Sequence, residues 1–97
     1  MFGENWFFNM RDKMEQILKK EMRNVAIELR EQLELTQEQM SEELFTSLRS
    51  YSDIECGITL SGSLTTILLL MKMPDPGAFL QGLRFKFEEL LLEESFV

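Results

Sequence analysis

The stretch LTQEQMSEELFTSLRSYSDIECG, residues 35–57, decides the fold because it carries the signals for two short helices in succession. Thr36 and Gln39 have the spacing of a capping box, in which the Thr hydroxyl accepts a hydrogen bond from the Gln39 N–H and the Gln side chain reaches back to Thr36. This pair predicts a helix over about residues 37–44.

The second helix of the stretch is also bounded by residues with defined roles. Thr46 or Ser47 can cap its first turn by accepting a hydrogen bond from the backbone. Gly57 can adopt the left-handed conformation that ends a helix. We therefore predict a helix over about residues 47–56, joined to the first by a tight turn.

Helical spacing of apolar residues continues on both sides of this stretch. Upstream, a stripe predicts an N-terminal helix over residues 5–22, which can run on into a helix that ends near residue 33. Downstream, Ser61 or Ser63 can cap an apolar helix over residues 64–71. MPDPG at residues 73–77 breaks the chain, because neither Pro continues a helix. An amphipathic C-terminal helix is expected within residues 76–95.

No useful run of alternating apolar and polar residues predicts a strand, so the expected fold is all-α. The length of 97 residues suits one domain with a single modest core. We predict five to six helices in one domain, residues 1–97. The N-terminal helix covers residues 5–22, the helix-turn-helix core covers residues 23–72, and the C-terminal helix lies within residues 76–95.

The composition argues against several classes of function. The chain has no His and a single Cys, Cys56, so neither a zinc site nor an internal disulfide is expected. Phosphate loops and dinucleotide fingerprints are absent. We expect no catalytic residue, metal or cofactor. The longest apolar run, residues 67–71, is too short to cross a membrane, and a reducing cytoplasmic location is expected.

A set of residues from position 30 onward follows the pattern R-x-x-x-x-L-[ST]-Q-x-x-[LM]-[AS]-x-x-L, a turn, then S-x-x-x-[IY]-S-x-[IL]-E-x-G. The residues are Arg30, Leu35, Thr36, Gln37, Met40, Ser41, Leu44, Ser47, Tyr51, Ser52, Ile54, Glu55 and Gly57. Residues 30–71 thereby resemble the helix-turn-helix of phage Cro and repressor proteins, the XRE family. The resemblance covers a little under half of the chain and implies a transcriptional regulator that binds double-stranded DNA.

The resemblance also implies roles for individual residues. Arg30 and Glu55 would form an ion pair between the first helix and the end of the recognition helix. Gln37 would hydrogen-bond a DNA phosphate beside a helix N-terminus; the alternative is a residue that merely favours helix initiation. The recognition positions would be Ser47, Leu48, Arg49, Ser50 and Asp53.

The chemistry of these positions suits base edges in the major groove. Arg49 can pair bidentately with guanine O6 and N7, and Asp53 can accept a hydrogen bond from cytosine N4. Ser47 and Ser50 can bond a base or a phosphate, and Leu48 can contact a thymine methyl group. The alternative for each residue is a solvated helix face with no ligand.

The net charge of −7 departs from the basic footprint of a DNA-binding domain. Glu38, Glu42 and Glu43 place negative charge on the first short helix, and Phe45 stands in the turn where the family usually has Gly. A second hypothesis is therefore a protein–protein interaction module that uses the acidic surface or Phe45 and has lost DNA binding. A weaker third is an acidic mimic of DNA.

Helix-turn-helix proteins that bind palindromic operators usually dimerise, so that two recognition helices reach successive major grooves. The C-terminal helix has a wide apolar side outside the motif. We expect a homodimer held mainly by Leu80, Leu83, Phe87 and Leu91, with help from the N-terminal helix. The alternative is that both terminal helices only complete the core of a monomer.

Overall fold

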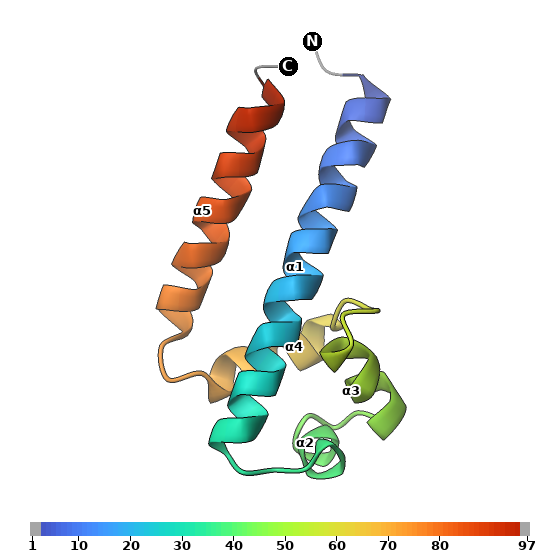
Figure 1. The fold of residues 1–97 in the computed structure, drawn as a ribbon, viewed down its shortest axis with the longest axis vertical. Helices are drawn as coiled ribbons and strands as arrows, with labels where there is room; N and C mark the ends of the chain where they lie inside the picture. Colours follow the sequence, from blue (N-terminus) through green and yellow to red (C-terminus); the bar gives the residue numbers. More distant parts are fainter. Residues whose placement is uncertain (1–2, 96–97) are drawn as a thin grey trace.

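The structure, a computed structural model, describes residues 3–95 and contains five helices in this range (Figure 1). No strand occurs among these residues, so the predicted all-α class is confirmed. The helices are α1 (Glu4–Gln32), α2 (Gln37–Glu43), α3 (Leu48–Glu55), α4 (Ser63–Lys72) and α5 (Pro76–Ser95).

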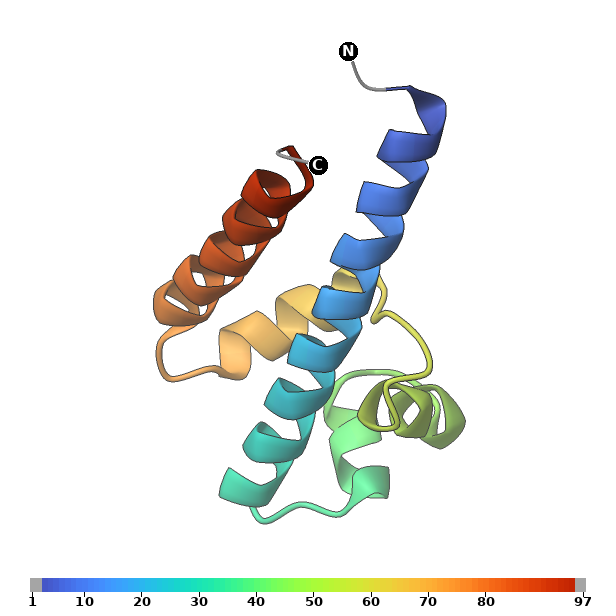
Figure 2. The ribbon, with the colours of Figure 1, turned by 45° about the horizontal axis from the view of Figure 1, so that its top comes forward.

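The longest element, α1, runs without interruption over 29 residues. The predicted N-terminal helix and its continuation are therefore one helix, because neither Gly nor Pro occurs between Glu4 and Gln32. Figures 1 and 2 show α5 beside the N-terminal half of α1, with α4 lying across α1. The short helices α2 and α3 pack together at the other end of α1.

The core lies around the C-terminal half of α1. Its buried side chains come from α1 to α4 and include the loop residue after α2: Met22, Ala26, Leu29, Met40, Leu44, Tyr51, Ile54 and Leu69. The N-terminal half of α1 contributes one buried residue, Met10, and otherwise packs against α5. The buried core thus draws its residues from Met22 in α1 to Leu69 in α4.

The predicted caps of the short helices are present. At α2 the Thr36 hydroxyl accepts from the Gln39 N–H at 3.1 Å, and the Gln39 side chain accepts from the Thr36 N–H at 2.9 Å. At α3 the Ser47 hydroxyl accepts from the Ser50 N–H at 3.1 Å. After α3, Gly57 adopts the left-handed conformation with φ of 72°.

The predicted cap of α4 is wrong. The residue before the helix is Gly62, which has no side chain to accept a hydrogen bond, and Ser63 is the first helical residue. The Ser61 hydroxyl instead pairs with the Thr66 hydroxyl at 2.6 Å, so it ties the loop to the helix rather than capping the first turn.

The break before α5 is shorter than the predicted residues 73–77. Pro76 is the first residue of α5, a position where its missing N–H costs nothing. The Asp75 carboxylate accepts from the Ala78 N–H at 3.0 Å and so satisfies one donor of the first turn. Apolar residues of α5 lie on both sides of the helix: Leu83, Phe87 and Leu90 are half-buried, whereas Leu80, Phe85 and Leu92 are exposed.

Candidate nucleic-acid interface

The turn between α2 and α3 is compact and left-handed. Phe45 has φ of 54°, although it is not glycine, and its side chain is 82% exposed. Its N–H donates to the Glu42 carbonyl at 3.1 Å, and the Thr46 N–H donates to the Ser41 carbonyl at 3.0 Å. The left-handed backbone is thus formed with an aromatic residue that makes little contact with the rest of the fold.

The expected ion pair between Arg30 and Glu55 is present and bidentate. Arg30 Nε lies 2.6 Å from Glu55 Oε2, and Arg30 Nη2 lies 3.1 Å from Glu55 Oε1. The two side chains are 22% and 5% exposed, so water has little access to the carboxylate. Arg30 Nη1 also donates to the Leu35 carbonyl at 3.2 Å. One guanidinium therefore joins α1, the α1–α2 loop and the end of α3.

These contacts change the proton affinities of the groups involved. Burial acts to raise the pKa of Glu55, but interactions with Arg30, Tyr51 and Gln37 together outweigh it, and the pKa lies below its usual value. The hydrogen bond to Glu55 raises the pKa of Arg30. Burial, with the nearby Glu55 carboxylate, raises the pKa of Tyr51, whose hydroxyl donates to the Ala26 carbonyl at 3.3 Å.

Gln37, predicted to meet a phosphate, is held by the same carboxylate. Its Nε2 donates to Glu55 Oε1 at 3.1 Å, and the side chain is half-buried. An amide NH₂ group has two N–H donors, and this contact occupies one of them. The structure therefore fixes the orientation of Gln37 and leaves its second donor for another acceptor.

The predicted recognition residues differ in whether their polar groups are already hydrogen-bonded within the protein. Ser47 and Ser50 are exposed, but the Ser47 hydroxyl donates to the Ser50 hydroxyl at 2.9 Å while capping α3. Leu48 and Arg49 are exposed, and Asp53 is half-buried. Arg49 makes no hydrogen bond or ion pair with any residue in the described range 3–95.

Two residues that were not among the predicted recognition positions, Ser52 and Cys56, lie on the side of α3 that carries Arg49. Ser52 and Cys56 follow Arg49 by three and seven positions, and Asp53 follows it by four, so all four lie on one side of the helix. Tyr51, Ile54 and Glu55 occupy the opposite, buried side. The helical spacing alone could have identified this face.

A third missed residue, Arg23, comes from α1. A Cβ atom built on Gly57 would lie 3.4 Å from Arg23 Cδ, so this side chain borders the end of α3. Arg23 is exposed, and its guanidinium donates to Asn24 at 3.3 Å. The loop after α3 has no Lys or Arg of its own, and Arg23 supplies a cation there from a distant part of the sequence.

Negative charge gathers on α2. Glu38 and Glu42 are exposed and make no ion pair within residues 3–95. Glu43 pairs with Lys72 at 3.2 Å, so its charge is offset by α4. The exposed acids therefore leave the surface of α2 negatively charged.

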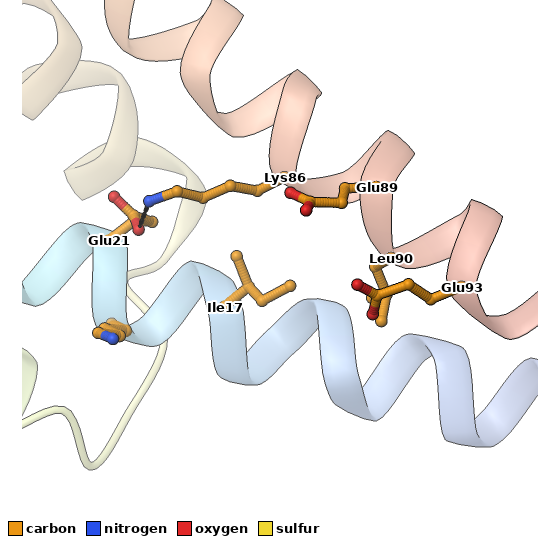
Figure 3. Close-up of a pocket in the computed structure, with 7 residues that line it drawn as sticks. Ile17, Glu21, Lys86, Glu89, Leu90 and Glu93 are labelled. Atoms are coloured by element: carbon orange, nitrogen blue, oxygen red, sulfur yellow. Dashed lines mark hydrogen bonds and ion pairs between the residues drawn. The ribbon is translucent and has the colours of Figure 1, made fainter.

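A polar pocket between α1 and α5 is an alternative site (Figure 3). Lys86 forms an ion pair with Glu21, and Ile17 and Leu90 also line the pocket. Glu89 and Glu93 complete the α5 wall, as Figure 3 shows. In the described part of the chain, no group of three or more His, Cys, Asp or Glu residues could hold a metal ion.

Comparison of the chain with protein-family models, with curated proteins and with solved structures gave no match. The resemblance to the Cro and repressor proteins therefore rests on the sequence pattern of residues 30–71 alone. Within residues 3–95, no helix has the length and apolar character needed to cross a membrane.

Proposed function

We propose that this protein is a sequence-specific DNA-binding transcriptional regulator of repressor type, which acts as a homodimer on a palindromic operator. The observation that carries the proposal is the network of Arg30, Gln37 and Glu55 behind α3. It fixes α3 against α1 and α2 while Arg49 stays unpaired on the outer face.

In this proposal α3 enters the major groove. Arg49 reads guanine, and Leu48 and Asp53 contact neighbouring base edges. Gln37 donates its second N–H to a phosphate at the start of α2, and Arg23 adds a contact to the DNA backbone near the end of α3. Ser47 and Ser50 act mainly by capping α3, because their hydroxyls are already hydrogen-bonded to each other.

The acidic surface predicts how such binding would behave. The chain has few cations near α3, so few counterions would be released from DNA and non-specific affinity would be low. Affinity for the operator would then depend on direct base contacts more than on charge. We expect a shallow decrease of affinity with increasing salt.

A second candidate function is favoured by the exposure of Phe45. An aromatic side chain that is 82% exposed beside Glu42 could anchor a protein partner with basic and apolar groups. In that case α2 and the turn form the binding surface, and α3 carries no ligand.

Fluorescence anisotropy with labelled fragments from upstream of the native gene distinguishes the two. A regulator should form a saturable complex with one fragment, and this complex should persist in excess unrelated DNA. The measurement is repeated at several salt concentrations. The absence of a specific complex even at low salt would contradict the DNA proposal, and the interaction module would replace it.

A further inference from the structure

We propose that the apolar groove between α1 and α5 binds a lipophilic cation, a small molecule that joins an apolar body to an ammonium group. The groove has a volume of about 610 Å³, within the range of about 300–1,000 Å³ that is typical of small-molecule sites. Its walls come from the N-terminal half of α1, from the C-terminal half of α5 and from Leu60 in the loop before α4. It therefore lies outside the core, along the part of α1 that α5 covers (Figure 1).

Three aromatic side chains line the groove. Trp6 and Phe7 are edge to face at the start of α1, with ring centroids 5.2 Å apart and ring planes at 77°. Phe87 of α5 is the third. The face of an aromatic ring attracts a cation, and rings at a steep angle to each other can contact one ammonium group from two directions.

A carboxylate lies on the same wall as Trp6 and Phe7. Glu15 lines the groove from α1, and its side chain is 36% exposed. Its partner is Arg11, at 3.2 Å, whose side chain is 80% exposed. An ion pair of this kind on a helix surface contributes little to stability. A ligand ammonium group can therefore take the place of the guanidinium at low cost while Arg11 turns into solvent.

Charge selects a cation as the occupant. The protein carries a net charge of −7, which attracts cations and repels anions at long range. Arg11 and Glu15 are the only charged residues that line the groove. An anion would find a guanidinium that Glu15 already holds, and a neutral molecule would use neither the carboxylate nor the attraction of the ring faces for positive charge.

Methionine side chains make the groove adaptable. Met10 and Met14 line it from α1. Methionine is unbranched and polarizable, so it adjusts to apolar groups of different shape. The inference is accordingly a class of cation, defined by one positive charge and an apolar body.

Trp6 reports binding directly because it is the single Trp of the chain and lines the groove. The probes are trimethyl(4-phenylbutyl)ammonium, neutral 5-phenylpentanamide and anionic 5-phenylpentanoate, which have similar apolar bodies and differ in charge. Titration of the full chain should give a saturable change in Trp6 fluorescence with the cation, at a dissociation constant of about 0.1 mM. The amide and the carboxylate should bind at least about tenfold more weakly. Calorimetry checks the affinities independently of fluorescence.

Variants at the carboxylate separate a local contact from net charge. Glu15→Gln should weaken binding of the cation about tenfold and leave binding of the amide unchanged. Asp12→Asn is the matched control, because it removes the same charge from α1 at an exposed residue that does not line the groove. Arg11→Gln should strengthen binding of the cation about threefold, since it removes the competitor for Glu15.

Variants at the aromatic wall keep the inference testable if Glu15→Gln fails to fold. Phe87→Leu keeps an apolar side chain without a ring and should weaken binding of the cation about threefold but not that of the amide. Phe85→Leu is the matched control, since Phe85 is exposed on α5 and does not line the groove.

Four results would overturn the inference. They are no change in Trp6 fluorescence at millimolar cation, equal or tighter binding of the amide or the carboxylate, equal effects of Glu15→Gln and Asp12→Asn, and an affinity for the cation that falls as the protein concentration rises. The last result would show that a second copy occupies the groove. A role for the cation as an effector of DNA binding rests on the proposed function, but the cation is titrated without DNA, so the two can fail separately.

Discussion

Arg30 and Glu55 stand 25 residues apart in the sequence and meet through two parallel hydrogen bonds of 2.6 and 3.1 Å. The pair is the main polar connection between α1 and α3 in the described part of the chain, and Gln37 of α2 joins it at 3.1 Å. Three helices therefore share one nearly buried carboxylate, and the position of α3 depends on it.

Removing either partner should destabilise the fold because a charge is then left without its counterion. Arg30→Met or Glu55→Gln should each lower the free energy of unfolding by roughly 3 kcal/mol, with the double variant far less destabilised than the sum of the two. Urea unfolding of all four proteins measures this coupling. The exposed pair Arg84 and Glu88 is the control, where the losses should be nearly additive. Additive losses at Arg30 and Glu55 would mean that the pair does not hold α3 in place.

Glu55 should make stability depend on acid pH. Its pKa in the folded state lies below the ordinary value of 4.5, so the unfolded chain binds the proton more readily than the folded protein does. The stabilisation is complete above about pH 4.5 and is lost as the pH falls through the folded-state pKa. Urea midpoints measured from about pH 6 to about pH 3 should fall more steeply for the wild type than for Glu55→Gln. Parallel curves would show that another carboxylate governs the acid response.

Arg49 should control sequence preference if the protein reads DNA. Arg49→Ala should weaken the specific complex by roughly 1–3 kcal/mol per half-site and relax the preference at one base pair. Arg84→Ala removes the same charge from α5 and should leave base preference unchanged. Base-by-base substitution of the operator in the anisotropy assay separates the two. Equal effects of both variants would show that Arg49 contributes only charge.

Gln37 and Arg23 should act differently from Arg49. If Gln37 bonds a phosphate as proposed, Gln37→Ala should weaken binding to all DNA sequences nearly equally. Arg23→Ala should reduce the slope of log affinity against log salt concentration by about 1. Affinity for specific and unrelated DNA at several salt concentrations measures both effects. A loss of base preference in Gln37→Ala would instead show that the network behind α3 positions the reading residues.

Phe45→Gly should stabilise the protein. Phe45 occupies a left-handed conformation that glycine adopts without cost, and its exposed side chain has little packing to lose. The gain should be about 1 kcal/mol, near the penalty for a non-glycine residue in this region. Phe85→Gly is the matched control, because Phe85 is also exposed but lies within α5, where glycine should lower stability by about 1 kcal/mol. Thermal unfolding of both variants tests this contrast.

The local features of α2 and α3 were predictable because each depends on neighbouring residues. The Thr36 capping box, the Ser47 cap and the left-handed Gly57 all follow from contacts within a few positions of the sequence. The pairing of Arg30 with Glu55 came from the resemblance to the Cro and repressor proteins, since nothing local connects residues in different helices.

Features that depend on tertiary neighbours were not predictable. The approach of Arg23 to Gly57 requires the angle at which α1 crosses α3, which no local pattern encodes. The exposure of Ile67 and Met71 could not be read from the apolar run around them, because that run does not show which side of α4 meets α1. Gly62 precedes α4 without a side-chain cap, although two serines nearby could have supplied one.

The unbroken α1 also has a mechanical consequence. Its 29 residues form a rod about 43 Å long, and the same rod packs against α5 near one end and against α3 near the other. No hinge separates these two regions of α1. A change in the tilt of α5 relative to α3 would therefore require the whole of α1 to move as one body. If two copies bind one operator, the rigid α1 helices would hold the two α3 helices at a fixed separation. Inserting even a few base pairs between the half-sites should then prevent both copies from binding at once.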